Sequence, residues 1–244
     1  MIKRITLLLG ILVISASSAS AQWQSVAPNL IGTGPYSNSG AMTYSDGVAW
    51  AGLYYLYKST DKGMSWEAVT LPNHGSSTIQ CISFYDRNDG LVCTGAGLFF
   101  TQDQGQTWRS YFAGESIYAA TFSGSGDVFV VGSVTTHNAS FTADGGKTWN
   151  THALGYVAKD FYEAAPGNVI AFLETTSDSH LATTTDFGAT WTERSGAMDP
   201  DAHTFGVMPC DENTLFGINE EGGNYSSNNL SEVFLSTDCR WNPG

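Results

Sequence analysis

The sequence STDKGMSW, residues 59–66, decides the fold because it is the first of four copies of one pattern. The later copies are TQDQGQTW at 101–108, TADGGKTW at 142–149 and TTDFGATW at 184–191, and a degraded fifth copy, STDCRW, spans 236–241. The aspartates of the intact copies are separated by 42, 41 and 42 residues: Asp61, Asp103, Asp144 and Asp186. A fixed period of this size indicates one supersecondary unit that is stacked repeatedly.

Each period holds four short β-like runs separated by turn signals. In the second period the runs are 78–85, 91–95, 98–101 and 108–112, and in the third they are 117–122, 128–133, 140–142 and 149–152. No segment keeps a 3.6-residue apolar pattern with caps, so we expect very little helix. Four short antiparallel strands in about forty residues are typical of a propeller blade. The motif count predicts an all-β propeller of five four-stranded blades.

The repeated motif has the residue types of a folding device. Its Asp can accept hydrogen bonds from the backbone of the turn, its Gly supplies a positive φ, and its Ser or Thr hydroxyl ties the turn to itself. Its Trp can fill the space between neighbouring sheets, which hides about 150–250 Å² of surface. We therefore expect structural rather than catalytic or calcium-binding roles for these residues: Asp61, Gly63, Trp66, Asp103, Gly105, Trp108, Asp144, Gly146, Trp149, Asp186, Gly188 and Trp191.

With this motif and period, the chain resembles the Asp-box, or BNR-repeat, family of β-propellers. Its short repeats look like those of the photosystem II stability and assembly factor type, and more distantly like those of sialidases, xyloglucanases and sortilin. The resemblance covers nearly the whole chain after residue 21. It implies that each Asp box joins the third strand of a blade to the fourth.

This strand phase offers an account of the two ends of the chain. Residues 22–26, QWQSV, match the fourth-strand start SWEAV at 65–69, whereas the sequence ends just after a third strand at 233–236. We expect the N-terminal strand to complete the last blade and close the ring, which removes exposed sheet edges. The alternative is that the chain is a fragment of a larger propeller, of roughly six to eight blades.

Residues 1–21 are predicted to be a signal peptide. Lys3 and Arg4 precede an apolar run at 5–14, and the small residues at 19–21 provide a cleavage site. The apolar run is too short to cross a bilayer. Residues 22–244 are then expected to form a single propeller domain that is secreted or periplasmic.

The charge of the chain argues against nucleic-acid and membrane partners. The sequence has 10 Lys and Arg against 23 Asp and Glu, a net charge of −13. Losing the two basic residues of the signal peptide makes the net charge more negative still, and the remaining basic residues are scattered singly. Nucleic acid and anionic membranes bind clustered basic residues. We expect a monomer that binds neither nucleic acid nor, after signal removal, a membrane.

Four cysteines in an exported chain predict two disulfides. Cys81 and Cys93 lie symmetrically about the turn at 86–90, so they can face each other across two strands. A bridge between Cys210 and Cys239 would pin the C-terminus, and the alternative is that the thiols are buried and unpaired. No CxxC or paired Cys/His spacing indicates a structural zinc, and we expect neither a metal nor a cofactor.

The rim opposite the Asp boxes is the expected working surface, because the second-to-third-strand loops and the connections between blades lie there. Long loops on a rigid scaffold tend to carry function, and the longest here is 220–232. All five histidines fall near this rim: His74, His137, His152, His180 and His203. The residues predicted to bind a ligand are His180, His203, Asp201, Tyr225 and Tyr36.

Two function classes remain open. The first is an exported, non-catalytic propeller that binds a protein, peptide or glycan through this rim. The second is a glycoside hydrolase acting on an extracellular polysaccharide, for which the candidate carboxylates are Asp178, Asp199 and Asp201. Sialidase chemistry is not expected, because the arginine motif of sialidases is missing. Arg109 and Arg194 come after motif tryptophans, so we expect them at the rim of the Asp boxes and away from the working surface. We favour the binding protein because no complete catalytic constellation emerges.

Overall fold

The computed structural model describes residues 41–52, 54–174 and 179–194, together with the strands Ala202–Pro209, Leu215–Glu221 and Glu232–Ser236. Side chains are described at 41–52, 54–174 and 180–193. Within these residues nineteen strands form five antiparallel sheets, and there is no helix. This part of the chain accordingly holds no helix long and apolar enough to span a membrane.

Four of the sheets have four strands and one has three, and within each sheet every strand pairs with the next along the chain. We call the sheets blades 1 to 5 in chain order. Their strands are β1 Ala41–Ser45, β2 Val48–Gly52, β3 Leu56–Ser59 and β4 Glu67–Val69; β5 Ile79–Phe84, β6 Gly90–Thr94, β7 Gly97–Thr101 and β8 Arg109–Tyr111; β9 Ile117–Phe122, β10 Phe129–Ser133, β11 Asn138–Thr142 and β12 Asn150–Ala153; β13 Val157–Ala165, β14 Asn168–Glu174, β15 Ser179–Thr184 and β16 Thr192–Arg194; β17 Ala202–Pro209, β18 Leu215–Glu221 and β19 Glu232–Ser236.

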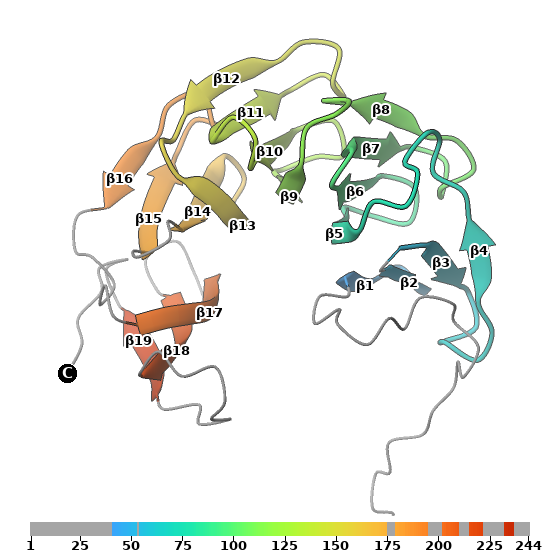
Figure 1. Ribbon diagram of the computed structural model, residues 1–244, viewed down its shortest axis with the longest axis horizontal. Helices are drawn as coiled ribbons and strands as arrows, with labels where there is room; N and C mark the ends of the chain where they lie inside the picture. The colour runs from blue at the N-terminus through green and yellow to red at the C-terminus, as the bar shows by residue number, and fades with distance from the viewer. Residues whose placement is uncertain are drawn as a thin grey trace, which may run out of the picture.

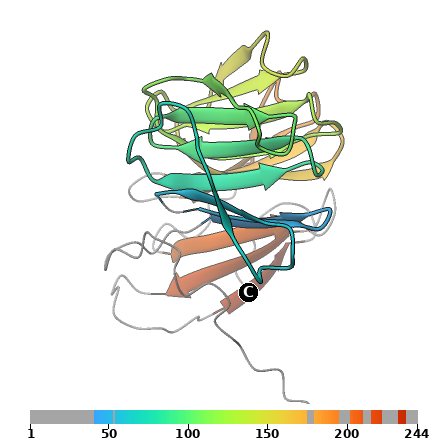
Figure 2. The same ribbon diagram turned by 90° about the vertical axis from the view of Figure 1, so that its right-hand side faces the viewer.

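The five blades lie along an arc with their first strands innermost (Figure 1). The first strands β1, β5, β9, β13 and β17 form a series in which each contacts the next. The fourth strands β4, β8, β12 and β16 lie on the outside of the arc. In the perpendicular view the sheets of neighbouring blades stack face against face (Figure 2). This is the architecture of a β-propeller, so the predicted all-β propeller class is confirmed.

The predicted strand phase is also confirmed. The runs expected in the second and third periods correspond to β5–β8 and β9–β12, and each intact motif lies between the third and fourth strands of a blade. Blade 5 has three strands among the described residues. The strand expected at 22–26, the signal peptide at 1–21 and the degraded fifth motif all lie outside the described residues, so ring closure stays a prediction.

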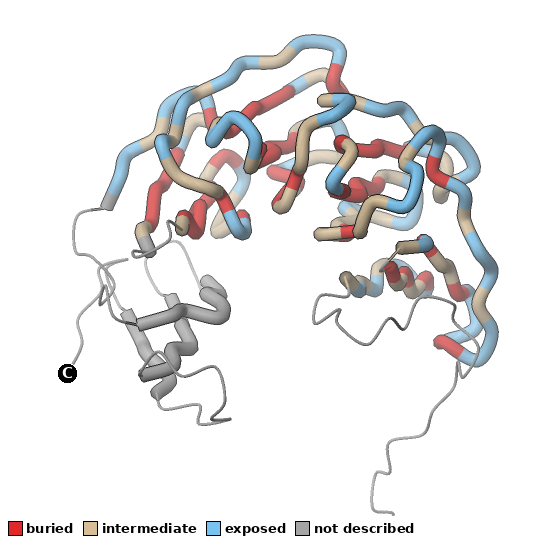
Figure 3. Tube along the Cα trace, in the orientation of Figure 1, coloured by how far each residue is buried: buried red, intermediate tan, exposed pale blue. Residues whose placement is uncertain are grey.

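The hydrophobic core lies between the blades rather than within them, as the buried middle strands show (Figure 3). β6 and β7 are buried along their whole length because each face of the sheet meets a neighbouring blade. Alternate side chains of β6 therefore enter different clusters. Val92 packs with Trp50 of blade 1, whereas Leu91 packs with Phe129 of blade 3.

The motif tryptophans extend these clusters between blades. Trp108 packs against the cluster between blades 1 and 2, Trp149 against that between blades 2 and 3, and Trp191 against that between blades 3 and 4. Each motif indole, including that of Trp66, donates a hydrogen bond of 3.0–3.1 Å to the carbonyl of the glycine three residues earlier. The indole is thus partly buried without leaving its N–H unsatisfied.

Each motif forms the same turn, which is held by its aspartate. In blade 1, Asp61 Oδ1 accepts from the Ser59 hydroxyl and from the Ser65 N–H, both at 2.8 Å, and Oδ2 accepts from the Ser65 hydroxyl at 2.6 Å. Gly63, at a φ of 84°, donates its N–H to the Ser59 oxygen at 2.8 Å. The equivalent bonds recur in the turns of Asp103, Asp144 and Asp186. Both oxygens of every motif carboxylate are therefore used inside the turn.

These hydrogen bonds favour the ionised carboxylates. Donation from Ser65 lowers the pKa of Asp61 to about 2, and the corresponding threonines, followed by backbone N–H groups, lower the pKa of Asp144 and Asp186 to about 2. Partial burial acts to raise the pKa of Asp103, but the hydrogen bonds that it accepts from Thr107, Thr101 and the Gln106 N–H together outweigh burial, and the pKa lies below the usual value. The motif aspartates are fixed hydrogen-bond acceptors at neutral pH.

The motif turns also join neighbouring blades. The Tyr111 hydroxyl of blade 2 donates to the Gly145 carbonyl in the turn of blade 3 at 2.9 Å, and Lys58 Nζ of blade 1 donates to the Gln104 carbonyl in the turn of blade 2 at 3.1 Å. The N–H groups of Gln104, Gly145 and Phe187 donate to the first-to-second-strand loops of their own blades. We call this end of the blades the Asp-turn rim and the other end the opposite rim.

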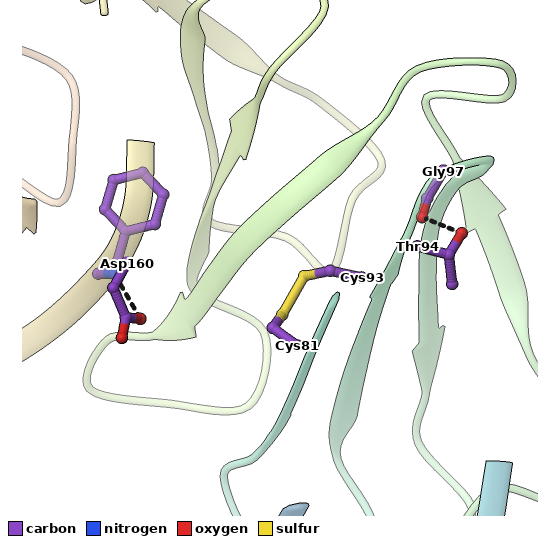
Figure 4. The surroundings of a disulfide bond; sticks show 6 residues. Cys81, Cys93, Thr94, Gly97 and Asp160 are labelled. Atoms are coloured by element: carbon purple, nitrogen blue, oxygen red, sulfur yellow. Dashed lines mark hydrogen bonds between the residues drawn. A yellow bond between two sulfur atoms is a disulfide. The ribbon is translucent and has the colours of Figure 1, made fainter. Parts of the chain in front are cut away.

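Cys81 of β5 and Cys93 of β6 form a disulfide, as predicted (Figure 4). The two residues are directly opposed in the strand register, and their Cα atoms are 4.9 Å apart. The bridge packs against the cluster between blades 2 and 3. The second predicted pair, Cys210 and Cys239, lies outside the described residues.

Candidate functional site

The structure describes only part of the predicted ligand-binding set. Of these residues, His180 is described with its side chain, and the backbone of His203 lies near the start of β17, at the opposite rim. The remaining predicted ligand-binding and catalytic residues lie outside the described residues: Tyr36, Asp178, Asp199, Asp201 and Tyr225. The structure therefore places His180 and His203 on neighbouring blades at the same rim and leaves the other five as predictions.

His180 has partners on two other segments of the chain. Its ring stacks on Tyr156, in the connection between blades 3 and 4, with the ring centroids 4.4 Å apart. Its Nδ1 lies 3.1 Å from Glu193 Oε1 on β16, and the His180 side chain is 20% exposed while that of Glu193 is 53% exposed. The imidazole is thus held in one orientation, and the carboxylate beside it is open to solvent.

Three further histidines lie at the opposite rim in separate places. His74 Nε2 lies 3.0 Å from the Tyr54 carbonyl, which ties the connection after blade 1 to a loop of the same blade. His137 is exposed at a φ of 57° in the β10–β11 turn, and His152 is part of β12. Within the described ranges, no group of three or more His, Cys, Asp or Glu could hold a metal ion.

The innermost strands β5, β9 and β13 share a β-bulge near the opposite rim. In β5, Ile79 and Cys81 face consecutive residues of β6, so Gln80 has no direct strand partner. Tyr118 in β9 and Lys159 in β13 likewise have no direct partner on the next strand. A bulge re-aims a side chain and is common beside functional sites. Its repetition at the same end of three adjacent strands therefore marks a candidate site.

The bulge residues of two neighbouring blades contact each other. Lys159 Nζ of blade 4 lies 5.3 Å from the centre of the Tyr118 ring of blade 3, within the range of a cation–π interaction. The same nitrogen lies 2.7 Å from Glu174 Oε2 at the end of β14. The side chains of Lys159 and Glu174 are 37% and 30% exposed. The ammonium is therefore held between an aromatic ring and a carboxylate while it remains accessible.

Asp160 follows the bulge on β13. It is the described carboxyl group at this rim whose pKa is raised by its surroundings. Its side chain is solvent accessible, and Figure 4 shows it on an inner strand, β13. Being surrounded by protein raises the pKa of Asp160, although hydrogen bonds from Tyr162 and from the Phe161 N–H act in the other direction. We call Gln80, Tyr118, Lys159, Asp160 and Glu174 the inner mouth.

The connection between blades 2 and 3 adds a further acid at this rim. Glu115 Oε2 accepts from the Ser133 hydroxyl at 2.7 Å, and the Ser116 N–H donates to Thr135 Oγ1 at 3.0 Å. These bonds fix the loop beside Tyr118. The arrangement presents an amide, a phenol ring, an ion pair and two further carboxylates at one end of the inner strands, which suits binding of a polar ligand.

Sequence reasoning missed the inner mouth. The alternation of side chains in 78–85 and 117–122 predicts the strands, but one extra residue in a strand leaves no periodic signal over so few residues. The prediction for Arg109 agrees with the structure. Its Nη2 donates to Gln102 Oε1 at 3.1 Å, which places it at the Asp-turn rim.

Comparison with known proteins supports the fold and leaves the family open. No protein-family model matches the chain, and no curated protein matches it. Among solved structures, the chain is similar to a GH74 enzyme from Niastella koreensis, with a TM-score of 0.54 and 18% identity over 82% of this chain and 30% of that enzyme. It is also similar to a chain of a nidogen/laminin complex, with a TM-score of 0.55 and 10% identity over 80% of this chain and 78% of the other.

A further similarity is to YCF48 bound to a D1 peptide, with a TM-score of 0.44 and 15% identity over 81% of this chain and 76% of YCF48. All these identities are low. The similarity to the GH74 and nidogen/laminin structures therefore establishes the propeller fold alone, because one propeller fold hosts many unrelated functions.

Proposed function

We propose that this chain is an exported, non-catalytic β-propeller that binds a protein, peptide or glycan through the opposite rim, with the inner mouth at its centre. The observation that carries the proposal is the repeated bulge, which brings Gln80, Tyr118 and Lys159 to the same end of three inner strands. His180 and its partners extend this surface outward along blade 4. His203, Asp201, Tyr225 and Tyr36 remain predicted members of the same surface.

The Asp-turn rim is the less suitable surface. Its four motif carboxylates are satisfied within their own turns, and its side chains are used to join one blade to the next. The same hydrogen bonds support our placing the chain with the Asp-box propellers. Export and a monomeric state rest on the predicted signal peptide and on the acidic composition.

A glycoside hydrolase is the second candidate function, and Asp160 is the observation that favours it. A carboxyl group with a raised pKa on an inner strand has one property of a general acid. Asp178, Asp199 and Asp201 remain the candidates for its partner. Release of reducing sugars from plant or bacterial polysaccharides, abolished by Asp160→Asn, would support the enzyme over the binding protein.

Site-specific photo-cross-linking tests the binding proposal. A photoreactive amino acid at position 80 reports on the inner mouth, and the same amino acid at position 64 is the matched control. Met64 is 71% exposed in the turn of blade 1, at the Asp-turn rim. Irradiation in the presence of the native extracellular fraction, or of glycans that the protein binds on an array, should give adducts at position 80 and not at position 64. Equal labelling at both positions would contradict the proposal.

A further inference from the structure

The contacts of Lys159 describe a site for an ammonium group. The nitrogen is 5.3 Å from the Tyr118 ring centre and 2.7 Å from Glu174 Oε2, and the two groups come from different blades. A ring face and a carboxylate around one cation is the usual arrangement for recognising an ammonium. In this chain the cation belongs to the protein itself.

The distribution of charge makes this contact unusual. The other lysines and arginines with described side chains all belong to the Asp-turn side of the blades: Lys58, Lys62, Arg87, Arg109 and Lys147. Lys159 is the one lysine or arginine side chain described at the opposite rim, and Glu174 is its ion-pair partner. Glu115, Asp160 and Glu193 add negative charge at the same rim. Such a surface attracts cations in a chain whose net charge is −13.

We propose that Tyr118 and Glu174 form a binding site for a lysine side chain of a basic peptide segment, and that Lys159 fills this site until such a segment displaces it. The inference rests on the proposed function and names the ligand class of its inner mouth. A peptide is favoured over a cationic sugar because a lysine side chain already occupies the site. Its ammonium contacts both the ring and the carboxylate, and the ion pair it makes is accessible enough to exchange.

Lys159 should compete with the ligand for its own site. Removing an ordinary binding residue weakens binding, whereas removing an internal competitor strengthens it. Lys159→Met should therefore raise the affinity for a lysine-containing peptide by roughly two- to tenfold. Lys147→Met removes the same charge from an exposed position in the Asp turn of blade 3 and should leave the affinity unchanged.

The ring and the carboxylate give the complementary variants. Tyr118→Leu and Glu174→Gln should each lower the affinity by roughly two- to tenfold, whereas Tyr118→Phe keeps the ring face and should retain binding. Both side chains are at least partly accessible, so these changes should leave the core intact. Circular dichroism and the thermal midpoint confirm folding before binding is compared.

Isothermal titration calorimetry at low salt tests the inference, with a blocked peptide of alternating lysine and serine as the probe. The same peptide with acetyl-lysine and a chitosan oligomer are the controls. We expect binding of the lysine peptide that salt weakens, no binding of the acetylated peptide, and the order of variants given above. Equal binding of the acetylated peptide, tighter binding of chitosan, or a Lys159→Met effect matched by Lys147→Met would overturn the inference.

The two proposals fail in different ways. If position 80 captures a partner but the lysine peptide does not bind, the proposed ammonium site is refuted while binding through the opposite rim is still supported. If positions 80 and 64 label alike, the binding rim itself is wrong.

Discussion

The hydroxyl of Tyr111 donates to the carbonyl of Gly145 at 2.9 Å, and this bond joins blade 2 to the Asp turn of blade 3. The Tyr111 ring also meets Trp149 edge to face at 5.4 Å. One side chain of an outer strand therefore connects a hydrogen bond at the rim to the cluster between two blades. Bonds of this kind explain how turns on the surface contribute to the stability of the whole arc.

Tyr111→Phe should lower the free energy of unfolding by about 0.5–1.5 kcal/mol, because it removes one partly buried hydrogen bond and keeps the ring. Urea denaturation followed by tryptophan fluorescence measures the change. Tyr85→Phe is the control, since the Tyr85 hydroxyl bonds to the Gly124 carbonyl at 3.2 Å in an exposed position and should cost less. A larger effect at Tyr85 would contradict this account.

Gly146→Ala should destabilise the chain by about 1–3 kcal/mol more than Gly155→Ala. Both glycines have a positive φ, 82° and 76°, so the backbone strain is similar. A Cβ at Gly146 would lie 2.5 Å from Cζ of the Tyr111 ring, whereas a Cβ at Gly155 would have nothing within 4 Å. Thermal denaturation of the two variants measures the cost of the contact between the new Cβ and the Tyr111 ring. Equal midpoints would contradict tight packing of blades 2 and 3 at this turn.

Stability should be steady near neutral pH and should fall as the pH drops from about 4 towards 2. The pKa values of Asp61, Asp144 and Asp186 are about 2 in the folded chain, below the ordinary 3.8. A carboxylate with a lowered folded-state pKa stabilises the fold above its unfolded-state pKa, and this contribution is lost as the pH falls through the folded-state value. Denaturant midpoints at a series of pH values measure this loss of stability. Asp144→Asn should make the midpoint depend less steeply on pH between about 4 and 2.

Asp160→Asn should raise stability at neutral pH. The folded-state pKa of Asp160 is raised mainly because protein surrounds it, so its charge opposes folding once the pH exceeds the ordinary value. Asparagine can still accept the Phe161 N–H bond through its oxygen. If the same substitution lowers ligand binding or hydrolysis, the carboxylate is retained for function. A loss of stability at neutral pH would show that the charge is needed to hold β13.

Non-reducing peptide mapping should join Cys81 to Cys93 and, by the sequence prediction, Cys210 to Cys239. Replacing Cys81 and Cys93 together by alanine should lower the free energy of unfolding by about 2–4 kcal/mol, because the bridge restricts the unfolded chain. A fragment joining Cys81 to Cys210 or Cys239 would contradict the observed pairing.

The fold could be predicted from the sequence because the Asp turn is a local device. The hydrogen bonds of Asp61 join residues at most four positions apart, so the residue types alone specify them, and the motif then fixes the phase of every strand. The partners of His180 could not be predicted in this way. Tyr156 and Glu193 come from a connection between blades and from another strand, and their meeting depends on how sheets pack.

The inner mouth was unpredictable for a similar reason. Tyr118 and Lys159 are bulge residues of separate blades, and their contact needs both an extra residue in each strand and the right angle between two sheets. The sequence did predict which loops lie opposite the Asp boxes, because the motif fixes the order of the strands in each blade. The sequence could not show which side chains of the inner strands meet at that rim.

The most direct test compares partner cross-linking at position 80 in two variants of the same protein, Glu174→Gln and Asp144→Asn, at a temperature where both are folded. We predict that Glu174→Gln lowers the yield of the cross-linked partner while its unfolding midpoint is unchanged. Asp144→Asn should keep the yield while its midpoint falls. Retained cross-linking in Glu174→Gln together with lost cross-linking in folded Asp144→Asn would place the working surface on the Asp-turn rim and contradict the account.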